Sequence, residues 1–330
     1  MTYIAGGDGA ALDGDLPPTL DEVVRSPRAA ERMGQLNYPK VIWSGVNYVI
    51  AELVDGVWLL DDPVCDYPQE ARDAMGFHFR ALALRRSTPA AAREEYWETS
   101  ALLERERPNE LTVAGRRFRV VRVDRFSRVG PLGPESPRAT DPDDVPDERP
   151  ADMHAHFCRH PLPEPVTPGS AELLGERWEH IPRAGRASAD VIRDARRALG
   201  SHPLIVRLAP RFIVLNNMDG FWSTCRGYVT CPRAARATLA DILRAMTEED
   251  DEDLSEDDRS AILRTAEALG IAPIHEVVLR GEIRYRIVRV EHIVRMNDDG
   301  PEPSRPSDHD PEEPLTGETA ELRTWPLRDE

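Results

Sequence analysis

One short segment concentrates side chains that bind metal ions. The run MHAHFCRH places His154, His156, Cys158 and His160 at every second position. In an extended chain, residues two apart point to the same side, so these four groups could line one side of the segment and hold a metal ion. A straight strand holds four ligands too far apart for tetrahedral zinc. Solvated linker histidines are the more ordinary interpretation, and we expect no cofactor.

Arginines on two similar segments are the second candidate site. The segments FRVVRVDRFSRVG and YRIVRVEHIVRMN carry matching arginines, namely Arg122, Arg128, Arg289 and Arg295. Alternation puts Arg122 on one strand face with Asp124, and Arg289 on one face with Glu291. A buried arginine needs an acceptor, because an unpaired buried charge costs several kcal/mol. Two interpretations stay open: a buried ion pair that fixes the strand register, or a guanidinium that binds an anionic ligand or a partner's carboxylate.

Two further pairs of charged residues occupy matching positions. Arg138 and Arg305 end the motif GPE-x-x-R, and we expect them to be exposed and to make surface contacts. Glu110 and Glu276 each precede a short apolar run; paired carboxylates suit acid–base catalysis, but a structural role is the simpler interpretation. The sequence lacks the phosphate loop and the GxGxxG, GxSxG, HExxH and CxxC signatures. No standard catalytic mechanism is therefore indicated.

The composition argues against several classes of protein. The chain has 330 residues, with 42 Lys+Arg against 59 Asp+Glu and a net charge of -17, which opposes general binding to nucleic acid. No apolar stretch approaches the ~20 residues of a membrane span, and the first residues do not resemble a secretory signal. Four cysteines are too few for a disulfide scaffold in a chain of this length. We expect a cytoplasmic protein.

The chain repeats itself. Residues 118–143 align without gaps to residues 285–310, with eleven of 26 positions identical, and residues 39–72 align to residues 203–236 in the same order. The aligned positions include three pairs that we expect to be structural anchors, Gly56 and Gly220, Trp58 and Trp222, and Pro68 and Pro232. Self-similarity of this kind indicates an internal tandem duplication.

Each repeat predicts the same order of elements, α-β-β-α-α-β-β. Asp-Gly between apolar runs predicts a hairpin at Gly56 and at Gly220, after which Trp58 or Trp222 opens the next strand as a core anchor. Proline fits the first turn of a helix, where its missing N–H costs nothing. Ser188 and Ser255 are expected N-caps, and Gly200 a helix stop. The long arginine-bearing strands carry apolar residues on both faces, which indicates central strands covered by helices.

The predicted fold class is α+β, with mainly antiparallel sheets, helices packed on them, and a pseudo-two-fold relation between the repeats. Whether the repeats share one sheet or form separate lobes stays open. The expected domains are a disordered N-terminus, a first unit, a Pro-rich linker, a second unit and an acidic flexible tail, at residues 1–17, 18–144, 145–187, 188–310 and 311–330.

The repeated motifs resemble those of one family. The phrase ELTVAGRRFRVVRVDRFSRVGPLGPESPRATDPD, its echo RYRIVRVEHIVRMNDDGPEPSRPSDHDP, and DG-x-W followed by PQEAR are similar to an uncharacterised actinobacterial family, domain of unknown function 5954. The resemblance covers most of the chain and both repeats. It implies no activity, cofactor or catalytic residue, and the MHAHFCRH segment is outside the shared pattern.

These observations favour a non-catalytic cytoplasmic protein that binds a partner protein or a small anionic ligand across its duplicated sheets. One alternative is an enzyme with an atypical site between the repeats, in which Arg122 or Arg289 holds an anionic substrate. This alternative fails if both arginines are closed into ion pairs. A second alternative is weak nucleic-acid binding, because a hairpin followed by a helix resembles small DNA-binding modules. The sequence does not identify the ligand or the oligomeric state.

Overall fold

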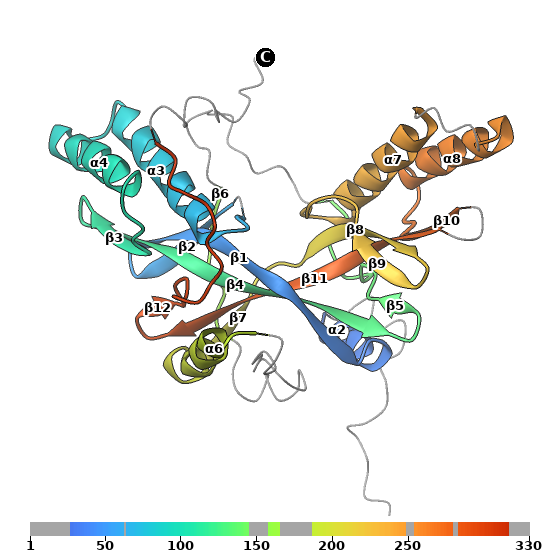
Figure 1. The fold of residues 1–330 in the computed structure, drawn as a ribbon, viewed down its shortest axis with the longest axis horizontal. Helices are drawn as coiled ribbons and strands as arrows, with labels where there is room; N and C mark the ends of the chain where they lie inside the picture. The colour runs from blue at the N-terminus through green and yellow to red at the C-terminus, as the bar shows by residue number, and fades with distance from the viewer. Residues whose placement is uncertain are drawn as a thin grey trace, which may run out of the picture.

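The described residues form one continuous antiparallel sheet with helices on both sides (Figure 1). The computed structural model describes residues 27–62, 64–144, 158–165, 187–248, 254–279 and 283–316. Twelve strands pair in these ranges, with the main order β6-β2-β1-β4-β11-β8-β9. The α+β class and the antiparallel pairing are as predicted. Strands from both parts of the chain share this one sheet and do not form two separate sheets.

The two halves of the chain, residues 27–144 and 187–316, follow the same order of elements, except that the first long strand of the first half corresponds to two shorter strands in the second. The first half contains α2 (Pro27–Asn37), β1 (Lys40–Val54), β2 (Val57–Asp62), α3 (Pro68–Leu84), α4 (Ala90–Leu103), β3 (Glu110–Val113), β4 (Arg116–Gly130) and β5 (Gly133–Pro134). The second contains α6 (Ala189–Ser201), β7 (Leu204–Arg207), β8 (Arg211–Met218), β9 (Phe221–Thr224), α7 (Pro232–Glu248), α8 (Glu256–Leu269), β10 (Glu276–Leu279), β11 (Ile283–Asn297) and β12 (Gly300–Pro301). Strand β6 (Cys158–Pro161) lies between the halves in sequence.

Strand registers recur in the two halves. In the first half Asn47 of β1 pairs with Val123 of β4. In the second half Arg211 of β8 pairs with Val290 of β11, at positions shifted by 164 and 167 residues. The same two shifts relate the aligned segments of the sequence. The central strands of the two halves therefore pair with their neighbours in equivalent registers.

The two long strands β4 and β11 meet at the centre of the sheet. Arg125 pairs with His292, and the flanking pairs are Asp124 with Ile293 and Phe126 with Glu291. When each residue is replaced by the residue aligned with it in the other half, the pair of Asp124 with Ile293 becomes the pair of Glu291 with Phe126. Under the sequence alignment, the pairing of β4 with β11 is therefore symmetric about Arg125 and His292, and we call this point the pseudo-two-fold axis.

Short sequence signals explain the hairpins next to these strands. Asp55 and Gly56 have φ values of 49° and 82°, and Asp219 and Gly220 have 54° and 85°. Two successive positive φ values define the type I′ turn that Asp-Gly favours and that suits the twist of paired strands. Both turns lie at the predicted positions.

Helix ends follow the sequence closely. Pro68 and Pro232 open α3 and α7, as predicted. The Ser188 hydroxyl accepts the Val191 N–H at 3.4 Å as the N-cap of α6. The predicted stop at Gly200, which would end the helix at Leu199, is wrong by two residues, because the helix continues to Ser201.

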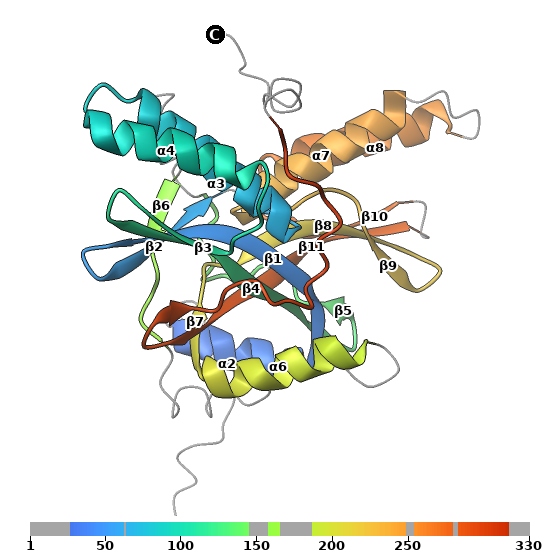
Figure 2. The same cartoon turned by 60° about the vertical axis from the view of Figure 1, so that its left-hand side comes forward.

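The helices cover the two ends of the sheet. Helices α3 and α4 pack on Phe118 and Val120 of β4, and α7 and α8 pack on Tyr285 and Ile287 of β11. Figure 2 shows these helix pairs on one side of the sheet and helices α2 and α6 on the other. Strands β4 and β11 are thus the central, covered strands that their apolar residues predict.

Several predicted features fall outside the described residues. These are the N-terminus up to residue 26, most of the predicted linker, and the tail beyond residue 316. Within the predicted linker, β6 pairs along the edge of β2. Among the described helices, none is both long and apolar enough to cross a membrane.

Candidate functional site

The matched arginines of the central strands lie in buried ion pairs. Arg122 pairs with Asp124, two residues along its own strand, and with Asp308 at 3.1 Å. Arg289 pairs with Glu291 in the same way, and with Asp141 at 3.0 Å. The side chains of both arginines are under 10% exposed. Alternation along each strand brings the arginine and its carboxylate together, and a distant segment supplies the second acceptor.

That distant segment comes from the other half in each case. The first closing segment (residues 131–144) crosses onto the second half, and the second closing segment (residues 298–313) crosses onto the first. The Arg122 N–H donates to the Glu302 carbonyl at 2.9 Å, and the Arg289 N–H donates to the Glu135 carbonyl at 2.8 Å. Each half is completed by the closing segment of the other.

A second layer of ion pairs fixes the closing segments to the helices. Arg72 at the start of α3 contacts Asp310 at 2.7 Å. Arg236 at the start of α7 contacts Asp143 at 2.6 Å. These arginines are buried while Asp143 is more than half exposed. The contacts are equivalent under exchange of the halves, like those of Arg122 and Arg289.

The two predicted tryptophan anchors lie where the two closing segments cross onto the other half. The Arg119 guanidinium is 5.0 Å from the Trp58 ring, and Arg286 is 5.4 Å from the Trp222 ring. A Cβ on Gly300 would lie 2.8 Å from Cζ2 of Trp58, and a Cβ on Gly133 would lie 2.9 Å from Cζ2 of Trp222. Glycine is therefore required where each closing segment passes a tryptophan.

The expected exposure of Arg138 and Arg305 is wrong. Their side chains are only 9% and 11% exposed. The glutamate of the GPE-x-x-R motif is the acceptor: Arg138 contacts Glu135 at 2.7 Å, and Arg305 contacts Glu302 at 2.6 Å. The motif is thus a local ion pair that lies against the central strands, and it does not offer a free arginine at the surface.

The Glu291 carboxylate at the centre of this network stays ionised. Although burial raises the pKa of Glu291, the charges of Arg289, Arg207 and Arg138 outweigh burial and hold that pKa well below its usual range. Arg128 and Arg295 are more loosely paired, at 3.6 Å from Glu31 and 4.0 Å from Asp124. Burial lowers the pKa of both arginines.

This geometry removes the basis of the enzyme hypothesis for Arg122 and Arg289. Both guanidiniums are closed into ion pairs with acidic residues of the same chain. Glu110 and Glu276 are also engaged, with Arg119 at 2.6 Å and with Arg286 respectively. These glutamates therefore orient the arginines that lie on the tryptophans.

The predicted metal ligands are only partly described. His154 and His156 lie outside the described residues, and for Cys158 only its backbone position in β6 is given. His160 is exposed. In the described ranges no three His, Cys, Asp or Glu side chains come together as a metal site would require.

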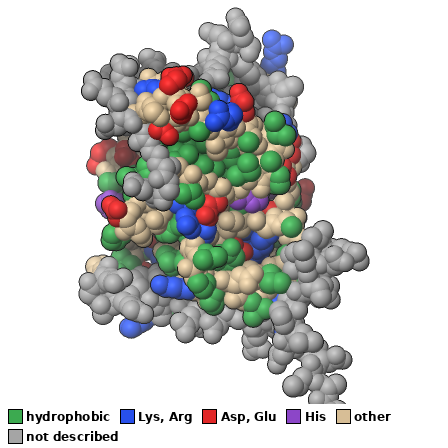
Figure 3. All heavy atoms as spheres, turned by 90° about the vertical axis from the view of Figure 1, so that its right-hand side faces the viewer, with side chains coloured by type: hydrophobic (Ala, Val, Ile, Leu, Met, Phe, Trp, Pro, Cys, Tyr) green, Lys and Arg blue, Asp and Glu red, His purple; other side chains and the backbone are tan. Residues whose placement is uncertain are grey.

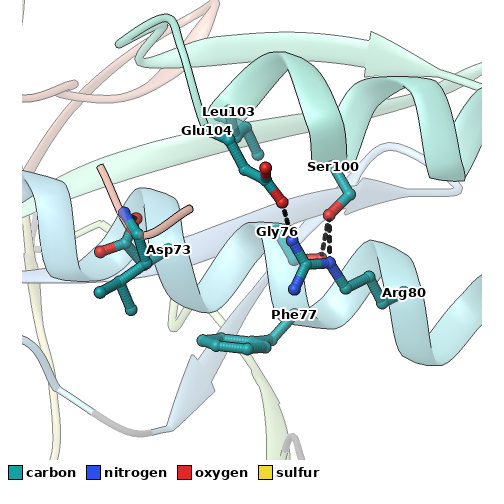
Figure 4. Close-up of a pocket in the computed structure, with 8 residues that line it drawn as sticks. Asp73, Gly76, Phe77, Arg80, Ser100, Leu103 and Glu104 are labelled. Atoms are coloured by element: carbon teal, nitrogen blue, oxygen red, sulfur yellow. Dashed lines mark hydrogen bonds and ion pairs between the residues drawn. The ribbon is translucent and has the colours of Figure 1, made fainter. Parts of the chain in front are cut away.

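A small pocket between α3 and α4 is lined by an ion pair (Figure 4). Its cavity of about 10 Å³ holds roughly one water molecule. Arg80 lines it, donating from Nε to the Ser100 hydroxyl at 2.8 Å and pairing with Glu104. The pocket is not at the pseudo-two-fold axis and offers no reactive group.

The sequence reasoning misses a polar cluster on that axis. Arg125 lies 5.0 Å over the Tyr228 ring, and Tyr228 meets the His292 ring edge-on at 6.0 Å. Arg125 and His292 are aligned positions of the repeat. That alignment is the signal that could have found them, since equivalent residues of a two-fold arrangement meet at its axis.

Sequence reasoning also misses an exposed apolar end of the second half. Its exposed side chains are Leu132, Met218, Phe221, Ile271 and Val278, which are between 49% and 89% exposed. Figure 3 shows this end of the molecule, with hydrophobic side chains spread over it. The residue that aligns with Leu132 is Asp299 of the second closing segment. It lies at the outer end of the first half, where it bridges Arg117 and Arg119 at 2.9 and 2.6 Å.

Comparison with known proteins assigns the chain to a family without assigning a role. Residues 22–311 match the family described as "Family of unknown function (DUF5954)". The match covers most of the chain, so the chain belongs to this family. Searches of curated proteins and of solved structures give no match.

Proposed function

We propose that this chain is a non-catalytic interaction protein, built from two copies of one α+β unit, that binds an extended segment of a partner protein along β9. The observation that carries the proposal is a difference between the two edges of the sheet. Strand β2 is paired on its outer side by β6. In the described part of the chain, β9 pairs only with β8.

The duplication is supported by the recurring registers and by the reciprocal closing segments. Two copies of a unit diverge at their surfaces more freely than in their cores, because core changes cost packing energy. A site present on one copy only is therefore expected at an exposed position. The end formed by β9 and β5 is such a position.

Strand addition is supported by the chemistry of the edge. An unpaired edge presents backbone N–H and C=O groups to a partner strand, and alternate side chains give specificity. The pairing of β6 with β2 is the same arrangement within one chain, over the four residue pairs that join Leu59–Asp62 to Cys158–Pro161. An extended partner segment on β9 would give the second half the cover that the first half already has.

Apolar surface at the hairpin supports a protein partner. Met218 and Phe221 pair across the β8–β9 turn and are 52% and 77% exposed. Burying such a side chain contributes about 1.5–3 kcal/mol. Monomeric proteins manage exposed edges with charges, prolines or cover, and β9 (FWST) contains no charge or proline.

The non-catalytic part of the proposal is supported by the closed ion pairs of Arg122 and Arg289. The net charge of -17 supports a protein partner over nucleic acid. We place the protein in the cytoplasm, which is supported by the free thiols of Cys65, Cys225 and Cys231, since disulfides are rare there.

The test is site-specific photo-crosslinking from β9. A photoreactive phenylalanine replaces Phe221 in one version of the full chain and Leu84 in the control. Leu84 is 68% exposed at the end of α3, so it matches Phe221 in exposure. Crosslinking of one defined protein from position 221 alone, abolished by Met218→Asp, supports the proposal.

Equal crosslinking from both positions, or none from position 221, contradicts it. A crosslink between two copies of the chain identifies the partner as a second copy. In that case Met218→Asp must also convert a dimer to a monomer in sedimentation.

A further inference from the structure

Strand β6 covers the outer edge of β2 in the first half (Figure 1). It runs antiparallel to β2, with Pro161 opposite Leu59. One residue further on, the Leu162 N–H donates to the Trp58 carbonyl at 2.9 Å. The cover of β2 therefore ends beside the tryptophan of that strand.

Leu162 also contributes its side chain to the core of the first half. It packs against the apolar cluster that contains Trp58 and Leu60. The register places Leu162 opposite Trp58, and residues directly opposite each other share one face of a sheet. The covering strand thus supplies an apolar side chain on the face of the tryptophan.

Strand β9 is the equivalent of β2 in the second half, and it pairs with its inner neighbour in the same register. Trp58 lies opposite Leu53 of β1. Trp222 lies opposite Asn217 of β8, at positions shifted by 164 residues in both strands. The outer edge of β9 therefore has the geometry of the outer edge of β2.

Two residues of β9 direct their backbone groups outward. The Cys225 N–H donates inward, to the Val214 carbonyl of β8 at 3.0 Å. Backbone groups of successive residues in an antiparallel strand point to opposite sides, so those of Trp222 and Thr224 point away from β8. The Trp222 carbonyl is thus the equivalent of the carbonyl that β6 binds in the first half.

Side chains at this edge differ between the halves. Trp58 is 6% exposed, whereas Trp222 is only partly buried. The glycine that lies against Trp222 follows Leu132, which is 77% exposed. Thr224 is exposed where β2 has the buried Leu60. A strand added to β9 would therefore meet apolar surface at Trp222 and a hydroxyl at Thr224.

We propose that the partner segment runs antiparallel to β9, as β6 does on β2, with an apolar residue opposite Trp222 and a hydrogen-bonding side chain opposite Thr224. Read from its N-terminus, the segment has the order polar, any residue, apolar. The N–H of the apolar residue donates to the Trp222 carbonyl. This inference rests on the proposed function and specifies the kind of segment that fits the edge.

The residues of β6 have this order themselves, as His160, Pro161 and Leu162. The middle position directs its backbone away from the covered strand, because the N–H of Leu162 on the next position points toward it. Proline is tolerated there, since its missing N–H removes no bond of the ladder. It also protects the new outer edge from further pairing.

The test adds a synthetic peptide with the sequence of residues 158–163, carrying Cys158→Ser, to the full chain. Nuclear magnetic resonance follows the backbone amides of β9 and the indole of Trp222. We expect saturable shifts at Trp222 and Thr224. A matched peptide that also carries Leu162→Asp must bind at least tenfold more weakly, because it places a charge opposite the tryptophan.

Two variants of the chain locate the binding. Thr224→Pro removes an N–H that points outward, so it removes no bond to β8 and must reduce the peptide affinity at least tenfold. Ser223→Ala changes a side chain on the other face and must bind within about twofold of the unchanged chain. Unchanged amide signals of β8 in Thr224→Pro confirm that this variant folds, and the Leu162→Asp peptide tests the unchanged chain independently of it.

Three results overturn the inference: no saturable shift at Trp222, equal binding of the Leu162→Asp peptide, or shifts at Trp58 in place of Trp222, which mean that the peptide displaces β6. None of them bears on crosslinking from position 221. Peptide binding at β9 without any crosslinked partner supports the antiparallel geometry and counts against the proposed function alone.

Discussion

The first half of this protein is closed at its outer end, and the second half is open. At the first end Asp299 ties Arg117 to Arg119, and β6 covers the edge of β2. At the second end Leu132 occupies the aligned position and is 77% exposed. The inner framework, by contrast, is the same in both halves down to the acceptors of Arg122 and Arg289. The comparison separates what holds the fold together from what is free to acquire a partner.

The reciprocal ion pairs provide the most severe way to break that equivalence. Arg122→Met removes the arginine from between Asp124 and Asp308, and Arg289→Met removes it from between Glu291 and Asp141. Glu291 keeps its contacts with Arg207 and Arg138. Breaking a buried pair in this way costs about 3–5 kcal/mol, so we expect each variant to lose about 4 kcal/mol of unfolding free energy. Urea denaturation measures the unfolding free energy of both variants. A difference between them of more than about 2 kcal/mol would show that the two ion-pair sites are not energetically equivalent.

The matched control for these variants is Arg244→Met. Arg244 pairs with Asp241 on the surface of α7, where its side chain is 49% exposed. Surface ion pairs contribute about 0–1 kcal/mol. A large loss in the control would mean that removing any arginine charge destabilises the chain.

The glycines at the tryptophans sharpen the comparison, because the halves differ there in burial. Gly300→Ala introduces a Cβ against Trp58, which is 6% exposed. Gly300 also has a φ of +133°, a backbone conformation that strains alanine. Strain and overpacking each cost about 1–3 kcal/mol, and we expect a loss of about 3 kcal/mol. Gly133→Ala should cost less, because Trp222 is more exposed and can move. Urea denaturation compares them.

Gly200→Ala is the control for the glycine pair. Gly200 lies inside α6, and no atom lies within 4 Å of its added Cβ. Alanine is the better helix former by about 1 kcal/mol, so this variant should gain stability. A greater cost for Gly133→Ala than for Gly300→Ala would contradict the burial argument.

The two halves differ at the pseudo-two-fold axis in a group that titrates, since Arg125 aligns with His292. Burial, and after it the charges of Arg211 and Arg125, lower the pKa of His292. The pKa of His292 is about 4 in the folded protein against 6.5 as its ordinary value. The unfolded chain therefore binds the proton first as pH falls. Stability should fall by about 3 kcal/mol between pH 6.5 and pH 4 on this account. His292→Gln should remove most of that dependence in urea denaturation at each pH, and His160→Gln should not.

The smallest expected effect concerns the helix pairs. Helix α8 has the cap Ser255, whose hydroxyl accepts the Asp258 N–H at 3.2 Å, whereas α4 follows Pro89 without a side-chain cap. Ser255→Ala should cost about 1 kcal/mol. Thr265→Ala, in the same helix but away from its N-terminus, serves as the control in thermal denaturation. Equal losses in the two variants would contradict a specific capping role.

Local signals in the sequence predict the local structure here, and long-range contacts account for what they miss. The Asp55–Gly56 turn and the proline at the start of α3 follow from backbone geometry that a few residues determine. The contact between Arg122 and Asp124 follows from strand alternation. The second acceptor, Asp308, lies 186 residues further on, and no short pattern encodes such a contact.

The wrong and missed site predictions have the same cause. Arg138 looks like a loop residue in the sequence, but its segment crosses to the other half and is covered there. The axis cluster joins residues of both halves, so neither repeat shows it alone. Strand β9 is exposed because no further strand pairs beside it in the described sheet. The residues of β9 alone do not determine whether a neighbouring strand is present.

The central claim is that the two halves complete each other and unfold as one unit. Native-state hydrogen exchange of Gly300→Ala tests it most directly, because this change lies in the second closing segment and acts on Trp58 of the first half. We predict that the slowest amides of β4 and of β11 lose the same opening free energy. Loss confined to the amides of β4, with those of β11 unchanged, would contradict the account.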